Sequence, residues 1–523
     1  MAGPSPPPSQ SPSPAATTIT DLNDDTFAHC ASFLNPRDVC SLAMTSTALN
    51  RLAYSDSIWQ RFFTERWQHE IPRASPSHWS GNGARELYLA RHTELQQFKF
   101  FDPFILDIHL QPKPFTQLLL HENYAYSVQG SVVEMINLDA YQKRSRDAIQ
   151  TLSDHKARIT CMRLFSHNEM SSCRGETQGE QNVLVTSSCD HSIRLWRKGS
   201  CLRCLRGHNG PVLSLSNKLL GEGSSKVLAS GGEDSTVRLW SLGSSGKRGQ
   251  HALKATFYGH EKGVNFLSVA GHKTSLLVSM SRDSKVKVWD TASSSSARSS
   301  PCVGMTSFRG APVNMKCHES LLYVAAGSSV TAVDLRTMQK VITVAVDQSK
   351  LYSFDAFPSK SLICTGGYGR AMLWDIRRNQ ESAKPDPITE LDGHDGPVTM
   401  LHMDSYKIVT GSAEMVRVWG VDTGVQTMSL LSCLTQDYMG RSNFDAMAID
   451  GCRAITACYC EDRGLLRFWD FNDATKPFTK IEDCPSSRFW DSLSDGSSSD
   501  DDDDDDDSED EDDDDNEDDD DEW

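Results

Sequence analysis

Three sets of histidine, hydroxyl and aspartate side chains recur along the chain, and one such set could perform nucleophilic catalysis. In each set a Ser or Thr lies four residues before an Asp, and a Trp lies six residues after that Asp. The sets are His155, Thr186, Asp190 and Trp196, then His208, Ser230, Asp234 and Trp240, and then His260, Ser279, Asp283 and Trp289. Hydrolases commonly present the nucleophilic serine in a Gly-x-Ser-x-Gly turn, which this sequence lacks. Three copies in series therefore favour a structural role over catalysis.

Short apolar runs predict the elements that hold these side chains. Residues 226–230 and 237–240 are strand-like, and the polar, glycine-containing residues 231–236 between them predict a hairpin turn. Degenerate units end at Leu138-Asp139, Val333-Asp334, Leu373-Trp374, Val418-Trp419 and Phe468-Trp469. The units close at positions 138, 196, 240, 289, 333, 374, 419 and 469, which are 41 to 58 residues apart. This spacing predicts eight repeats, or seven if the unit near 115–139 is something else.

The repeat pattern resembles the WD-repeat family over about residues 115–482. The resemblance implies a mainly β fold, a β-propeller in which each complete set clamps one blade through hydrogen bonds. Peptides commonly bind the narrow top face of such propellers, beside the clamps. The basic residues expected there are Arg158, Lys262, Arg282 and Arg370. They could attract a phosphorylated or acidic peptide, or they could be ordinary solvated charges.

In residues 19–63 the apolar side chains recur at the spacing of short helices. The sequence Asn35-Pro36-Arg37-Asp38 separates the first predicted helix from the second. This segment resembles an F-box. The resemblance implies that an apolar set contacts or supports a Skp-type cullin adaptor, and the set comprises Leu22, Leu34, Pro36, Val39 and Trp59. The usual Leu-Pro opening of the family is Leu22-Asn23 here, which could loosen the first contact. The alternative is a helical cap that buries its apolar faces within this protein.

The remaining segments differ in composition. Residues 1–18 are rich in Pro, Ser and Ala, which predicts a disordered leader. Residues 64–114 are predicted to be a linker, either with a helix near residues 84–98 or as a flexible spacer. Residues 483–523 predict a disordered acidic tail, which could be a solubility tail or a ligand for a basic partner. Residues 500–522 hold 17 Asp and 4 Glu, so the net charge of -19 becomes +2 without them.

Composition also narrows the function classes. A near-neutral body gives no sign of nucleic-acid binding, and no apolar run is long enough to cross a membrane. Cys201 and Cys204 lack a second ligand pair, so we expect no metal site, and no cofactor motif is present. The scattered cysteines favour reduced thiols in the nucleus or cytoplasm.

Together, a predicted F-box and WD repeats resemble the substrate receptors of SCF-type ubiquitin ligases. Under this hypothesis the protein is not an enzyme. The F-box would bind the adaptor and through it cullin, and the propeller would bind the protein substrate for ubiquitination. The alternative is a WD-repeat scaffold or acidic chaperone without a ligase role.

Overall fold

The computed structural model describes fifteen segments between residues 24 and 472. These segments are 24–31, 33–67, 83–100, 103–166, 182–221, 226–242, 252–292, 301–345, 350–358, 361–376, 386–404, 407–420, 429–435, 443–459 and 463–472. The predicted leader and acidic tail, together with Leu22, lie outside the described residues.

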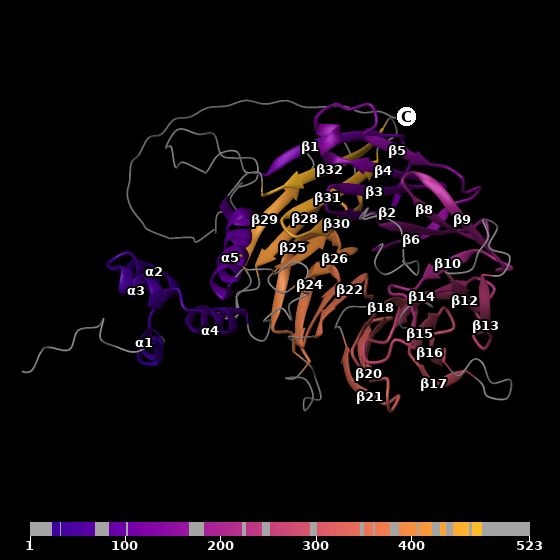
Figure 1. Ribbon diagram of the computed structural model, residues 1–523. Helices are drawn as coiled ribbons and strands as arrows, with labels where there is room; N and C mark the ends of the chain where they lie inside the picture. Colours follow the sequence, from indigo (N-terminus) through magenta and orange to yellow (C-terminus); the bar gives the residue numbers. More distant parts are fainter. Residues whose placement is uncertain are drawn as a thin grey trace, which may run out of the picture.

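Eight antiparallel four-stranded sheets are the blades of a β-propeller (Figure 1). Blades 1 to 4 comprise β2 (Phe115–His121), β3 (Tyr124–Gln129), β4 (Val132–Asn137) and β5 (Ile149–Leu152); β6 (Ile159–Phe165), β7 (Val183–Ser188), β8 (Ser192–Arg197) and β9 (Ser200–Arg206); β10 (Val212–Leu215), β11 (Val227–Gly232), β12 (Val237–Ser241) and β13 (Leu253–Phe257); and β14 (Val264–Val269), β15 (Leu276–Ser281), β16 (Lys285–Asp290) and β17 (Cys302–Ser307).

Blades 5 to 8 repeat this order from the inner strand outward. They comprise β18 (Pro312–His318), β19 (Leu321–Ala326), β20 (Ser329–Asp334) and β21 (Lys340–Ala345); β22 (Ser353–Phe357), β23 (Leu362–Gly366), β24 (Tyr368–Asp375) and β25 (Thr389–Pro397); β26 (Met400–Met403), β27 (Lys407–Gly411), β28 (Met415–Gly420) and β29 (Ser429–Thr435); and β30 (Asn443–Asp450), β31 (Arg453–Tyr459), β32 (Gly464–Asp470) and β1 (Phe104–Leu110). The second strands are almost wholly buried because neighbouring blades cover both faces, and this burial supplies most of the propeller core.

The last blade is closed by a strand from far upstream. Strand β1 pairs with β32 from Phe104 opposite Asp470 to Leu110 opposite Gly464. Across this junction Arg467 donates two hydrogen bonds to the Asp107 carboxylate, at 2.7 and 2.9 Å. The predicted propeller boundary at residue 115 was therefore wrong, because β1 completes blade 8 before blade 1 begins.

Blade 1 also ends differently from the sequence prediction. The position equivalent to the clamp tryptophans is Ile136, which lies opposite Ala125, and not Leu138. Leu138 instead begins the short helix α6 (Leu138–Gln142), because the side chain of Asn137 accepts a hydrogen bond from the backbone N–H of Ala140 at 2.9 Å.

The N-terminal module is helical, and it lies beside the propeller (Figure 1). Its helices are α1 (Asp24–Ala31), α2 (Pro36–Ala43), α3 (Thr47–Ala53) and α4 (Asp56–Trp67). Asn35 caps α2 by accepting from the Asp38 N–H at 2.9 Å, and Pro36 occupies the first turn, where no backbone donor is needed. Ser46 caps α3 in the same way.

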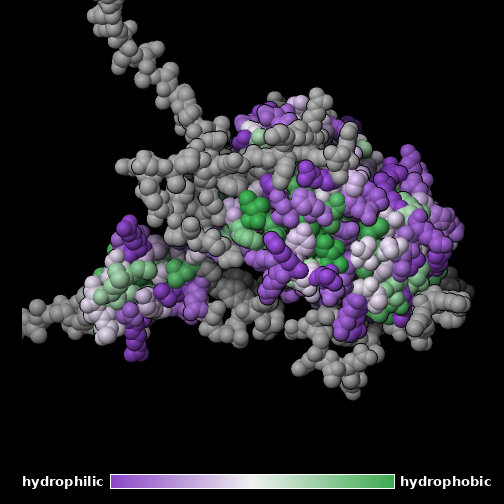
Figure 2. Space-filling model, turned by 90° about the horizontal axis from the view of Figure 1, so that it is seen from above, coloured by the Kyte–Doolittle hydropathy of each residue, from purple (hydrophilic) through white to green (hydrophobic). Residues whose placement is uncertain are grey.

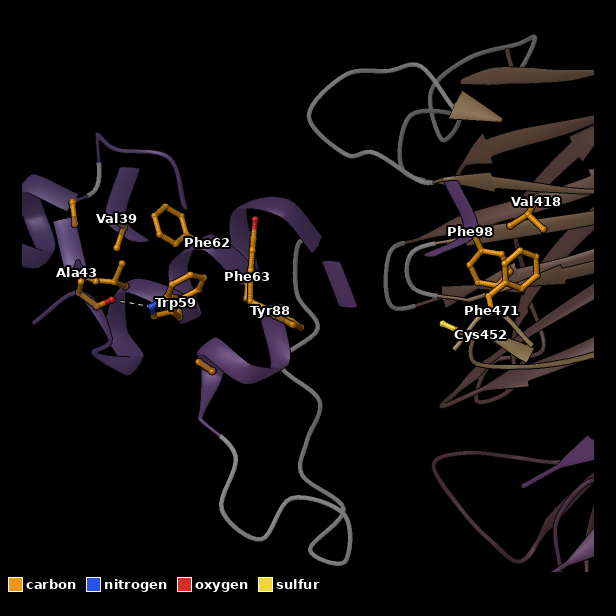
Figure 3. Close-up of a cluster of buried hydrophobic side chains, with 14 of the residues drawn as sticks. Val39, Ala43, Trp59, Phe62, Phe63, Tyr88, Phe98, Val418, Cys452 and Phe471 are labelled. Carbon is orange, nitrogen blue, oxygen red and sulfur yellow. Dashed lines mark hydrogen bonds between the residues drawn. The ribbon is translucent and has the colours of Figure 1, made fainter. Parts of the chain in front are cut away.

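Helix α5 (Ala84–Phe100) connects the helical module to the propeller. At one end Tyr88 packs edge-on against Trp59, with ring centroids 5.4 Å apart. At the other end Phe98 packs against Phe471, with centroids 4.3 Å apart (Figure 3). The Lys407 ammonium lies 5.6 Å from the centre of the Phe98 ring. Both contacts belong to one hydrophobic cluster.

Among the described helices, none is long and apolar enough to cross a membrane.

Candidate functional site

The three predicted residue sets each form a continuous hydrogen-bonded chain. In blade 2, Trp196 Nε1 donates to Thr186 Oγ1 at 2.8 Å, this hydroxyl lies 2.8 Å from His155 Nε2, and His155 Nδ1 lies 2.9 Å from Asp190 Oδ2. Blades 3 and 4 repeat the arrangement with distances of 2.7 to 3.1 Å, through His208, Ser230, Asp234 and Trp240, and through His260, Ser279, Asp283 and Trp289.

Local turn chemistry positions each aspartate. The Asp190 Oδ1 atom accepts from the backbone N–H of Ser192 at 3.0 Å, which closes a tight turn, and the intervening His191 takes a left-handed conformation with φ of 64°. The other carboxylate oxygen accepts from the N–H of Lys156, next to the clamp histidine, at 3.1 Å. One carboxylate therefore fixes both the hairpin turn and the loop that carries the histidine.

The electrostatics of the clamps match this structural arrangement. Burial lowers the pKa of His155 and of His260 below the ordinary value, which keeps both rings neutral. Burial by itself would raise the pKa of Asp190, but hydrogen bonds from Ser192, His155 and Lys156 outweigh it and lower this pKa to about 2. An ionised aspartate beside a neutral histidine is stable here.

Blade 7 carries a modified clamp that the sequence pattern revealed only in part. His394 Nε2 lies 2.7 Å from Thr410 Oγ1, to which Trp419 Nε1 donates at 2.8 Å. The missing aspartate is replaced by Ser412, whose hydroxyl lies 3.1 Å from His394 Nδ1. Without a carboxylate, burial and then the nearby Arg417 charge lower the pKa of His394 to about 4.

The clamp hydroxyls Thr186, Ser230 and Ser279 are fully buried, so a substrate could not reach them without blade separation. All their partners come from the same blade and its adjoining loop. The arrangement can satisfy buried polar groups and hold turns in place, and it offers no accessible nucleophile.

The four predicted top-face cations have different surroundings. Arg282 Nη1 lies 3.2 Å from Glu233 Oε1, and Arg370 Nη1 forms an ion pair with Glu390. Arg158 and Lys262 are exposed, and no ion pair joins either of them to a described acidic residue. The carboxylates therefore reduce the positive charge of two of the four positions, and Arg158 and Lys262 remain the stronger candidates for binding an acidic peptide.

The predicted adaptor residues divide into buried and half-buried groups. Val39 and Trp59 are fully buried in the helical module, where the Trp59 indole donates to the Ala53 carbonyl oxygen at 2.8 Å (Figure 3). Leu34 and Pro36 are half-buried. Of the two predicted roles, contact or support, burial leaves Val39 and Trp59 the supporting one, because their side chains face the core.

Two apolar side chains outside the predicted adaptor set are far more exposed. Phe33 lies in the turn between α1 and α2 and is 80% exposed, and Met44 caps the end of α2 and is 81% exposed. Figure 2 shows hydrophobic surface on this module. The sequence signal for the exposure of Phe33 is its position directly before Leu34 in the turn between two predicted helices. Met44 follows the last residue of α2, so the helical spacing does not direct its side chain into the core.

Comparison with known families agrees with both parts of this architecture. The family model described as F-box-like matches residues 25–65, and the WD domain, G-beta repeat model matches residues 146–197, 199–241 and 252–290. The chain carries an F-box-like domain and WD repeats. Each repeat match begins with the outer strand of one blade and continues through the three inner strands of the next, so the three matches contain the complete clamps of blades 2, 3 and 4. The described residues form eight blades.

Curated relatives resemble only part of the chain. It is 26% identical over 341 residues to the ribosome biogenesis protein ytm1 of Neosartorya fischeri, covering 55% of this chain and 68% of that protein. It is 25% identical over 257 residues to the kinesin-like protein KIF21B of Mus musculus, covering 49% of this chain but 13% of that protein. Identity with the target of rapamycin complex subunit LST8 of Saccharomyces cerevisiae is 26%, over 46% of this chain and 77% of that protein.

Among solved structures, the computationally designed Ika8 protein shares the fold. The alignment has a TM-score of 0.52 at 16% identity, and it covers 71% of this chain and 99% of the designed one. This likeness concerns the fold alone. The F-box with its exposed apolar surface and the top face of the WD propeller remain the two candidate binding regions.

Proposed function

We propose that the protein is the substrate-recognition subunit of an SCF-type ubiquitin ligase. In this role the F-box binds a Skp-type adaptor and through it cullin, while the propeller binds a protein substrate for ubiquitination. The observation that carries the proposal is an F-box-like domain that exposes Phe33 and Met44 and is joined to a WD propeller through α5.

Exposure of large apolar side chains on this small module supports a partner. Phe33 and Met44 contribute little to the module's own core, and contact with a second protein would remove their apolar surface from water. Aromatic and methionine side chains are enriched in the buried centres of protein interfaces. Val39 and Trp59 would support this surface from below by filling the core.

The packing of α5 supports a positioning role. Phe98 is 2% exposed between Phe471 and Lys407, so the helix that leaves the F-box is anchored on blades 7 and 8. A fixed separation between adaptor and substrate would raise the effective concentration of a substrate lysine near the conjugating enzyme. The receptor itself needs no catalytic residue for this function.

The substrate proposed for the top face is a phosphorylated or acidic peptide. Arg158 and Lys262 are exposed, and an Arg guanidinium can hold two oxygens of a phosphate or carboxylate at once.

The acidic tail could in turn bind a basic partner. We propose a nuclear or cytoplasmic location, since the described cysteines are free thiols.

The experiment is a pull-down of the tagged full chain from cell extract, probed for the adaptor and for cullin. The wild type should retain both proteins, and the double variant Phe33→Ala with Met44→Ala should retain neither. The matched control is Met305→Ala, because Met305 is 57% exposed on β17 of the propeller. A wild type that retains neither protein would favour a WD-repeat scaffold without a ligase role, in keeping with relatives such as a ribosome biogenesis protein and a complex subunit.

A further inference from the structure

A cluster of cations lies at the end of blades 1 and 2 that is opposite the clamps. Part of the cluster follows α6 in the connection between β4 and β5, and part forms the turn between β8 and β9. A Cβ atom on Gly199, in the second connection, would come within 2.5 Å of the Gln150 side-chain oxygen on β5, so the two connections are neighbours. We call this cluster the basic rim, and its members are Lys143, Arg144, Arg146, Arg197 and Lys198.

The charge of the basic rim is only partly compensated within the described residues. Four of the five cations are exposed, Arg197 is half-buried, and none of the five forms an ion pair with a described acidic residue. The two connections, residues 138–148 and 197–200, also hold Asp139 and Asp147, which leaves them a net charge of +3. The basic rim therefore presents a positively charged surface to solvent.

The last described residues of the chain lie at the same end of the neighbouring blade 8. The Phe471 N–H, just after β32, donates to the Cys452 carbonyl oxygen at 3.2 Å, so the chain leaves the propeller beside the turn between β30 and β31. Arg453 Nη1, at the start of β31, donates to Asn123 Oδ1 at 3.2 Å. The Asn123 amide in turn donates to the Asp139 carboxylate on α6 at 2.6 Å. Hydrogen bonds thus link the exit of the chain to the helix that carries the basic rim.

We propose that the basic rim binds the acidic tail of the same chain through residues 500–522. These residues hold 17 Asp and 4 Glu, so their charge is complementary to that of the basic rim. Asp500 comes 28 residues after Asn472, and a chain of that length spans at most about 100 Å. A tethered segment has an effective concentration on the order of mM, which compensates for the small contribution of each exposed ion pair.

The basic rim and the top face lie at opposite ends of the blades. Strand β8 begins at Ser192 beside the clamp turn and ends at Arg197, and six residues at about 3.3 Å each separate these ends by roughly 20 Å. Arg158 lies at the clamp end, where its carbonyl oxygen accepts from the Cys189 N–H at 2.8 Å. Docking at the basic rim therefore holds the carboxylates of the tail away from Arg158. Under the proposed function this prevents the tail from competing with an acidic substrate, but the docking itself does not depend on a ligase role.

The test is carbodiimide cross-linking of the purified full chain at about 0.1 M salt, followed by mass spectrometry. The reagent joins a carboxylate directly to a lysine amine, so it reports contact of the tail with Lys143 and Lys198. We expect tail links to concentrate on these two lysines and to fall at about 1 M salt, where screening limits charge interactions to about 3 Å, to the level seen at Lys254, which is exposed on β13. An equal mixture of isotope-labelled and unlabelled chains distinguishes links within one chain from links between two.

A rim variant that keeps both lysines tests the role of the arginines. Arg144→Gln, Arg146→Gln and Arg197→Gln together should lower the yield of tail links at Lys143 and Lys198 at least roughly threefold at an unchanged thermal midpoint, since three of the five cations are lost. The matched control removes three exposed arginines elsewhere in the propeller, at Arg158, Arg309 and Arg336, and should keep the wild-type yield.

Four results would overturn the proposal. They are tail links centred on the top-face residue Lys262, links spread evenly over exposed lysines, links that join two chains, and a yield that the rim variant does not change. None of these results bears on adaptor binding, which the pull-down tests separately.

Discussion

The substitution Phe98→Ala tests whether helix α5 anchors the F-box to the propeller. The Phe98 ring is 2% exposed, lies 4.3 Å from the Phe471 ring, and has the Lys407 ammonium 5.6 Å from its centre. Truncation of a buried Phe costs about 3 to 5 kcal/mol, which includes the cavity left behind, and loss of the cation–π contact adds to this. The propeller strands keep their own clusters, so most of this cost should appear as undocking of the C-terminal end of α5.

Hydrogen exchange measures this undocking segment by segment. An opening free energy lowered by about 3 to 5 kcal/mol should accelerate amide exchange at the end of α5 by roughly 150- to 5,000-fold. Exchange in β15 and β19, on the far side of the ring, should not change. The control is Tyr258→Ala, a truncation of an aromatic side chain that is 73% exposed. Unchanged exchange in α5 of the Phe98 variant, or equal acceleration throughout the propeller, would refute the anchoring role.

Three further predictions concern the clamps, the pH dependence and the top face. Trp240→Phe removes the indole donor to Ser230 at 2.7 Å, so the free energy of unfolding should fall by about 1 kcal/mol or more in denaturant titrations; an unchanged midpoint would show that the clamp contributes nothing. The pKa of His394 is lowered to about 4 in the folded chain, so between about pH 6.5 and 4 this histidine binds a proton in the unfolded chain but stays neutral in the folded chain. The thermal midpoint should therefore fall as the pH falls through this range. A constant midpoint would contradict the buried neutral ring. Arg158→Ala with Lys262→Ala should weaken capture of a phosphorylated or acidic substrate peptide at least tenfold at unchanged thermal stability, whereas equal capture by wild type and variant would remove these residues from the binding face.

The repeated part of the fold could be predicted because its signals are local. Each complete clamp places a hydroxyl, an Asp and a Trp within eleven consecutive residues, and the tight turn at Asp190 depends only on its immediate neighbours. The degenerate blades keep the spacing of the residues that close each unit, and this spacing predicts their number. The pairing of β1 with β32 could not be predicted this way, since Asp107 and Arg467 meet across almost the whole chain.

The candidate binding residues were less predictable because sequence pattern does not tell which apolar face is covered. Val39 and Trp59 match the helical period that buries a residue, and the same period made them candidates for an interface. Phe33 shares the helical spacing of residues 19–63 but lies in the turn after α1, and Met44 follows the last residue of α2, so the period alone does not show that both are exposed. Glu233, the partner of Arg282, belongs to the preceding blade, so this ion pair depends on the packing of blade 3 against blade 4. Glu390 lies on β25 next to the β24 residue Arg370, so this pair depends on the pairing of two strands within blade 6.

The central claim is that the exposed apolar surface of the F-box binds the cullin adaptor. The most direct measurement is a calorimetric titration of a purified Skp-type adaptor into the purified full chain, the Phe33→Ala and Met44→Ala double variant, and the Met305→Ala control. The wild type and the control should bind with the same Kd, and the double variant should bind at least tenfold more weakly at unchanged thermal stability, since each anchor contributes roughly 1 to 2 kcal/mol in a desolvated interface. Absence of adaptor binding by the wild type, or equal affinity of the double variant, would contradict the claim.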